Sequence, residues 1–323
     1  NTTFGKEAGD SIQSGGNYNI TIGRASGKLL TTGDENSYIG TYAGLFNVTG
    51  SSNTAIGYNS QYGASGQSHS NNTSLGAHSL KAITTGASNT AIGESAGVDM
   101  SSSSFNTFIG SKTGSNVTTS ANNIAIGYAA MFGNGSVPGT GLGKNTIIGV
   151  GAAYSHTTGV ENTVIGYNAG TYISDASNTV IIGSNANATG NITTAANGLI
   201  AIGMQAGISH TSGADCVYIG RTAGKEATTG NYNTGIGTGS LAASAANVLT
   251  GANNTALGYN AGFDLEGAAH SNTFIGSTAG NVATTAVENT TVGFNCDIQD
   301  DTATNQIVIG NNVTGTADNA VHI

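Results

Sequence analysis

The sequence predicts an all-β protein, a parallel β-solenoid of about 18 coils with a 17-residue period. Three observations predict this class. A motif close to N-T-x-I-G-x-x-A-G recurs along all 323 residues, β-branched residues occupy fixed places in it, and composition is unusual, with 51 Gly and only 8% charged residues. Disordered chains carry few β-branched residues and high charge. The single proline and the missing Gly-X-Y period exclude collagen.

The repeat is anchored by a glycine that follows an apolar residue, from Gly5 to Gly310. Eighteen such anchor glycines are separated by seventeen steps, of which eleven are 17 residues long. The residue before the anchor is Ile in 14 of 18 repeats, and the fourth residue before it is Asn in 14 of 18. Fixed spacing of this kind indicates a repeat array. We therefore expect residues 1–323 to be one continuous solenoid, as a fragment or a processed chain.

Each unit is too short for a helix pair and suits two short strands and two turns. The three residues before each anchor, such as 163–165, alternate in the manner of a strand. We expect a second strand near Thr pairs such as Thr31–Thr32 and Thr228–Thr229. The anchor glycine supplies the backbone freedom for the turn. At about 4.8 Å for each coil, the stack would form a rod roughly 85 Å long.

Stacking places like residues above like residues, so each repeat position becomes a column. We expect the Ile column to fill the coil and the Asn column to form a ladder of side-chain amides. The residue two before the anchor points the other way and is apolar or aromatic in 13 of 18 repeats. This residue is expected to meet neighbouring chains; the alternative is an Ala-rich outer face without a partner. The column residues that we single out are Ile22, Ile56, Ile92, Ile109, Ile165, Ile219, Ile275, Asn53, Asn89, Asn162 and Asn254.

Four repeats are longer than the others, and we expect their extra residues to form outward loops. These loops lie near residues 60–72, 131–144, 187–198 and 241–253. Insertions in repeat arrays often gather on one surface and serve binding. Tyr62, Phe132 and Tyr172 are the candidate receptor-contact residues, because aromatic rings can stack on sugars. Packing within the turns is the alternative role for these rings.

Charge and hydropathy exclude several classes of partner. The formal net charge is −9 with only eight Lys and Arg, and no basic run is present. Nucleic acids and anionic membrane surfaces call for clustered cations, so we expect neither as a partner. No apolar run approaches the roughly 20 residues that span a bilayer, so membrane insertion is not expected.

Residues that carry chemistry are scattered. Cys216 and Cys296 lie four repeats apart, too far for a disulfide on strand spacing, so buried thiols are expected. The six His form no HxH or HExxH pattern, and no Asp or Glu recurs at repeat spacing. We therefore expect no catalytic residue, no metal and no cofactor. Adjacent Thr residues point to opposite faces, which argues against a T-x-T ice-binding array.

The motifs "NTAIG" and "NTALGYNAG", at 53–57 and 254–262, carry a resemblance. They resemble the "S-V-A-I-G" repeats in the heads of trimeric autotransporter adhesins of the YadA type. They are still more similar to arrays in bacteriophage tail-fibre and virion proteins, as is the terminal "NQIVIGNNVTGTADNAVHI". The resemblance implies a left-handed β-roll in an intertwined or side-by-side homotrimer. The adhesin heads have a shorter repeat and are followed by a neck and a stalk, which favours the phage fibre.

These observations together predict a structural shaft of a bacteriophage tail fibre or virion appendage that supports host attachment. Its expected partners are itself, neighbouring fibre or baseplate proteins, and a host surface glycan or protein; its expected place is the virion. A bacterial surface adhesin head, in an extracellular location, is the alternative function. A polysaccharide-acting β-helix enzyme is a lesser one.

Overall fold

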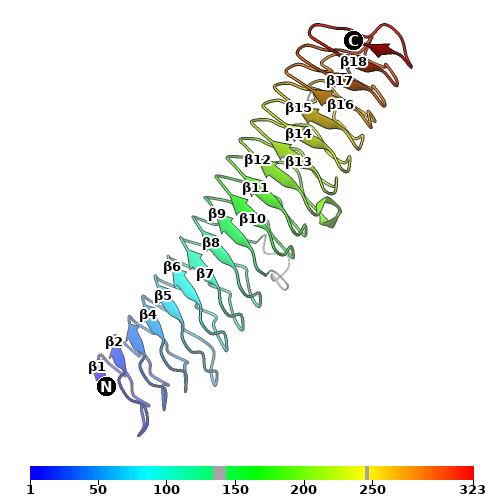
Figure 1. Ribbon diagram of the computed structural model, residues 1–323. Coiled ribbons are helices and arrows are strands. Elements are labelled where there is room, and N and C mark those ends of the chain that lie inside the picture. Colours follow the sequence, from blue (N-terminus) through cyan, green and yellow to red (C-terminus); the bar gives the residue numbers. More distant parts are fainter. Residues whose placement is uncertain (134–142, 244–246) are drawn as a thin grey trace. The chain divides into compact units, whose positions relative to one another are not determined.

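The repeat forms one coil of a parallel β-solenoid, as the sequence predicts. The computed structural model describes residues 1–133, 143–243 and 247–323. These residues divide into two compact units, Asn1–Glu161 and Asn162–Ile323. In each unit the strands follow one another as parallel rungs, and each rung is joined to the next by the turns of one coil (Figure 1). The described part of the chain contains one short 3-10 helix, η1 (Thr194–Ala196).

Except for the last, the strands are three residues long and end at the residue before an anchor glycine. The strands of the first unit are β1 (Thr2–Phe4), β2 (Ile20–Ile22), β3 (Ser37–Ile39), β4 (Thr54–Ile56), β5 (Thr73–Leu75), β6 (Thr90–Ile92), β7 (Thr107–Ile109), β8 (Ile124–Ile126) and β9 (Thr146–Ile148). Those of the second unit are β10 (Thr163–Ile165), β11 (Val180–Ile182), β12 (Ile200–Ile202), β13 (Val217–Ile219), β14 (Thr234–Ile236), β15 (Thr255–Leu257), β16 (Thr273–Ile275), β17 (Thr290–Val292), β18 (Ile307–Ile309) and β19 (Val321–His322).

The anchor glycine ends each strand for a steric reason. Gly166, after β10, has φ +140°. A Cβ at Gly166 would lie 2.5 Å from the carbonyl oxygen of Gly183 in the next coil. The backbones therefore approach too closely for any side chain at this column, and only glycine fits.

Neighbouring strands pair in register, so each repeat position stacks on itself. Ile39 of β3 lies opposite Ile56 of β4, and Ala201 of β12 lies opposite Tyr218 of β13. The long repeat after Gly57 leaves this register intact, because β4 and β5 pair in the same way, with Thr54 opposite Thr73. The added residues are accommodated in the turns.

The prediction that the Ile column fills the coil is wrong. In β2 to β18 the middle residue is the buried one, as with Phe108 in β7 and Ile147 in β9, and the residues on either side of it are partly exposed or exposed. Alternation along a strand explains this outcome. The buried Asn four before the anchor shares a face with the middle residue, so a ladder inside the coil requires the Ile column to lie outside. The corrected residues are Ile22, Ile56, Ile92, Ile109, Ile165, Ile219 and Ile275.

The core is filled by two positions whose sizes compensate. Each large ring in the middle of a strand occurs with glycine four after the anchor, and in four coils a small middle residue occurs with a large residue there; Ala91, Ala201 and Ala256 are small middle residues that also have glycine. A Cβ at Gly114, for example, would lie 2.7 Å from the ring of Phe108. Examples of the two kinds are Tyr38 with Gly44, Phe108 with Gly114, Tyr218 with Gly224 and Phe274 with Gly280, against Ala55 with Gln61, Ser74 with Leu80, Ala125 with Met131 and Gly235 with Leu241.

The predicted second strand is reduced to single bridges. Ile173 pairs with Ile192, and Leu249 pairs with Gly267, each as an isolated parallel bridge. The Thr hydroxyls contribute there by bonding the next coil, since Thr31 Oγ1 donates to the carbonyl oxygen of Val48 at 2.9 Å. The described coils thus have one regular strand each, because the chain turns again after one or two paired residues.

Candidate interaction surface

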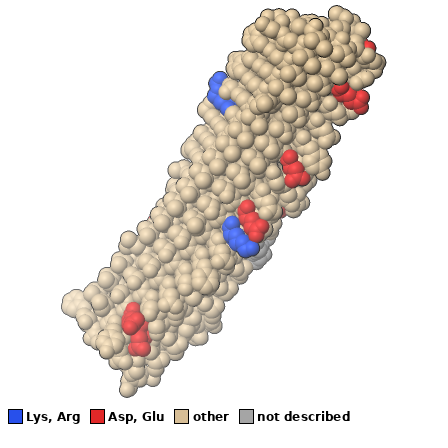
Figure 2. Space-filling view, viewed as in Figure 1, with Lys and Arg blue, Asp and Glu red and all other residues tan. Residues whose placement is uncertain are grey.

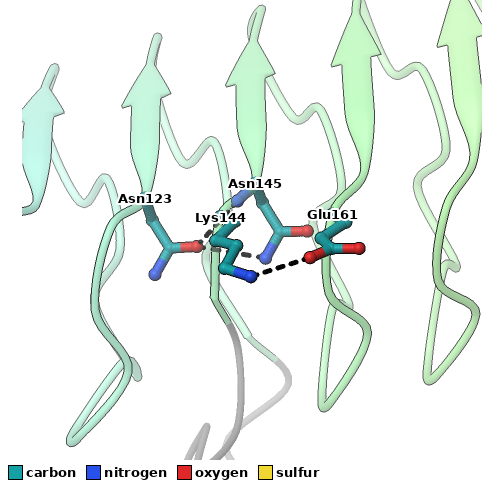
Figure 3. A network of polar contacts seen from close by, with 4 residues as sticks. All are labelled: Asn123, Lys144, Asn145 and Glu161. Carbon is teal, nitrogen blue, oxygen red and sulfur yellow. Dashed lines mark hydrogen bonds and ion pairs between the residues drawn. The ribbon is translucent and has the colours of Figure 1, made fainter.

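A buried ladder of asparagine amides joins most of the strands to their neighbours. The backbone N–H and the Nδ2 of Asn106 both donate to Oδ1 of Asn89, at 3.0 and 3.1 Å. The same Nδ2 donates to the carbonyl oxygen of Ser120 at 3.0 Å. Figure 3 shows the next part of the ladder, where Asn145 donates to Asn123 in the same way. The predicted amide ladder is therefore confirmed.

The ladder has interruptions that the structure accommodates. Thr179 continues it, because its hydroxyl donates to Oδ1 of Asn162 at 2.8 Å. Cys216 stands at the same column, and its thiol donates instead to the carbonyl oxygen of Gly230 at 3.1 Å. Asn53, Asn89, Asn162 and Asn254 are all buried. Their role is structural, since burial removes them from any ligand.

The outer face of the strands is uncharged and rich in β-branched residues. It consists of the column one before the anchor, mostly Ile, and the column three before it, mostly Thr with some Ile and Val. No Lys, Arg, Asp or Glu occurs in either column. Ile22 is 36% exposed and Leu75 is 47% exposed, so this face is open in a single chain. We call these two columns the Thr/Ile face.

The three candidate contact residues differ in their surroundings. Phe132 stacks on Tyr154, with ring centroids 4.9 Å apart and planes 10° from parallel. Tyr62 packs edge-on against Phe46 at 5.0 Å. Tyr172 belongs to the second unit and is 47% exposed. Of the predicted loops, those at 131–144 and 241–253 lie partly outside the described residues, and η1 lies within 187–198.

Tyr62 belongs to a larger aromatic cluster on consecutive coils of the first unit. Tyr42 lies 6.4 Å from both Tyr58 and Tyr62, and Tyr58 lies 5.2 Å from the ring of His78. The guanidinium of Arg24 sits over the Tyr42 ring at 5.5 Å. Sequence reasoning missed Tyr42, His78 and Arg24 as members. Their positions one or two after successive anchors could have revealed the cluster.

Charged side chains are few on the face shown in Figure 2, and one Lys or Arg there lies against an Asp or Glu. Lys28 pairs with Glu7 at 2.8 Å, and Lys144 pairs with Glu161 at 2.9 Å, the latter drawn in Figure 3. Exposed pairs of this kind contribute little to stability. The surface therefore offers hydroxyls, amides and aromatic rings rather than a strong electrostatic field.

Among the titratable groups, the buried His69 and the half-buried Asp297 have pKa values that burial shifts into or near the accessible pH range. Burial lowers the pKa of His69 to about 4, which keeps its ring neutral. Burial raises the pKa of Asp297 to about 6, even though its carboxylate accepts hydrogen bonds from the N–H groups of Val282 and Ile298. Cys216 and Cys296 are free and buried.

Within the ranges that the structure describes, no group of three or more His, Cys, Asp or Glu side chains is arranged to hold a metal ion. The described residues also include no helix that is long and apolar enough to cross a membrane. The sequence matches no protein-family model and no curated protein.

Proposed function

We propose that this chain forms the structural shaft of a homotrimeric bacteriophage tail fibre or virion appendage, which supports attachment to the host cell. The observation that carries the proposal is the Thr/Ile face. A parallel sheet is ordinarily covered on both faces, and here one face fills the coil while the other is uncharged and carries the exposed Ile column along both units.

A second and third copy of the chain are suited to cover this face. Each copy presents the same columns at the same coil spacing, so a rotation about a common axis brings like columns together. The Ile side chains then lose their remaining contact with water, which favours association. The resemblance to trimeric adhesin heads and phage fibre arrays supports the same arrangement.

The mechanical role rests on the bonds between coils. Neighbouring coils are joined by paired strands, in most places by the amide ladder, and in several by Thr hydroxyls. A load applied across the axis must break several of these bonds together. Such a solenoid holds a neighbouring fibre or baseplate protein at a fixed distance without any chemistry of its own.

Immunogold electron microscopy with antibodies to the chain tests the setting. Gold on the tails or appendages of phage particles supports the proposal. Gold on the envelope of uninfected bacteria would instead favour an adhesin head. A parallel depolymerisation screen on bacterial polysaccharides tests for an enzyme, and products of glycan cleavage would contradict a purely structural role.

A further inference from the structure

The aromatic cluster on the first unit carries an inference beyond a shaft, because a shaft needs no ligand. We define the cluster as Arg24, Tyr42, Phe46, Tyr58, Tyr62 and His78. We propose that this cluster binds a polysaccharide of hexopyranose units, with the sugar chain lying along the stack of coils.

The rings form a strip across neighbouring coils, in which they meet tilted, as Tyr42 and Tyr58 do at 58°, or edge-on, as Tyr58 and His78 do at 85°. The backbone N–H of Tyr42 donates to the carbonyl oxygen of Arg24, and that of His78 donates to the carbonyl oxygen of Tyr58. These bonds place the residues one coil apart. One coil advances about 4.8 Å, which is close to the length of one pyranose ring. A sugar chain along the stack thus stays in step with the rings.

The chemistry of the strip matches that of a sugar. A pyranose has an apolar face of C–H groups and a rim of hydroxyls, and Tyr offers an apolar ring with a polar tip. Tyr58 is 48% exposed and provides the accessible ring. Arg24 stands at the end of the strip and supplies several N–H donors in a fixed geometry.

The repeat itself does not require these aromatic residues. The position of Tyr42 and His78 has a left-handed backbone, with φ +62° and +61°. This conformation disfavours bulky side chains and suits Asn. Asn stands there in the equivalent places Asn59, Asn168, Asn185, Asn260, Asn295 and Asn312. A Tyr at this place costs backbone energy that an amide would avoid, which favours a role in binding for Tyr42, whereas His tolerates this conformation as Asn does.

Charge also favours a sugar over a nucleic-acid ligand. Arg24 is the one cation of the cluster, and the chain as a whole has a net charge of −9. Nucleic acids would require several clustered cations. A polyhydroxyl ligand requires none, and it can use the single guanidinium as a hydrogen-bond donor.

The test is an array of capsule and O-antigen oligosaccharides from bacteria, probed with the fluorescently labelled wild-type chain. Tyr58→Ala removes the accessible ring, while Tyr58→Phe keeps it. Tyr259→Ala is the matched control, because Tyr259 also follows its anchor, is 56% exposed and belongs to the second unit. Circular dichroism checks that each variant keeps the fold.

The expected result is glycan binding by wild type, a loss of at least tenfold for Tyr58→Ala, and little change for Tyr58→Phe and Tyr259→Ala. No binding of wild type to any glycan on the array would overturn the inference. Equal binding by wild type and Tyr58→Ala would overturn it too. Either failure leaves the shaft proposal standing, because that proposal is tested by particle location and oligomeric state.

Discussion

The size compensation inside the coil predicts a strong coupling between Phe108 and Gly114. The ring of Phe108 is completely buried, and a Cβ at Gly114 would lie 2.7 Å from it. Phe108→Ala should lower the free energy of unfolding by about 3–5 kcal/mol, since it leaves a cavity. Gly114→Leu alone should cost about 1–3 kcal/mol by overpacking, together with about 1–2 kcal/mol for a side chain in the left-handed region.

The double variant should be more stable than the sum of the single variants predicts. It recreates a combination already present in the chain, where Ser74 occurs with Leu80, and Leu80 has φ +49°. The new Leu fills the space that the ring vacates, so we expect a coupling of at least about 2 kcal/mol in the double-mutant cycle. Urea denaturation followed by circular dichroism measures all four proteins. Additivity within about 0.5 kcal/mol would refute the compensation.

Three further predictions concern buried polar groups. His69 is neutral in the folded protein, with a pKa of about 4 against the ordinary 6.5, so the stability contributed by the neutral ring is present above pH 6.5 and is lost as the pH falls toward 4. The free energy of unfolding should drop by on the order of 3 kcal/mol over that range. His69→Gln should make the urea midpoint depend less on pH. Asp297 has its pKa raised from 3.8 to about 6, so the folded state loses stability as the pH rises through that window. Asp297→Asn should therefore raise the melting temperature at pH 7.5 and leave it nearly unchanged at pH 3.5, and a lower value at pH 7.5 would contradict the assigned cause. Asn106→Ala removes the oxygen that accepts from the backbone N–H and Nδ2 of Asn123 and the amide that donates to the carbonyl oxygen of Ser120, and it should cost at least about 2 kcal/mol. Asn106→Thr should cost less, because Thr179 serves in the same column; equal losses would argue against the ladder.

The sequence was sufficient to predict the fold class, the period and the amide ladder. All three follow from the spacing of residues alone, because a Gly and an Asn at fixed places in most repeats are compatible with few backbone conformations. Apolar content could not predict which residues of each strand point into the coil, because apolar residues occur on both faces in this chain. The decisive clue was the buried Asn column, such as Asn89, which shares a face with the middle residue of each strand.

The aromatic cluster shows a second limit of sequence reasoning. Tyr62 stands out in a long repeat, but Tyr42 and His78 occupy a turn position that holds Asn in other coils. Which rings meet depends on side-chain direction at left-handed positions, and the sequence does not encode that direction in an obvious pattern. The absence of a regular second strand from the described coils could not be predicted either, because the backbone conformation between two turns decides whether one or three residues pair.

The measurement that tests the account most directly is the mass of the chain in solution, by size-exclusion chromatography with light scattering. The Thr/Ile face predicts three times the chain mass of 31.8 kDa for the wild type. Ile165→Asp places a charge on this face and should shift the mass toward a single chain, because burying an unpaired charge opposes association. A wild-type mass near 31.8 kDa would contradict the account, since the exposed isoleucines would then face water throughout.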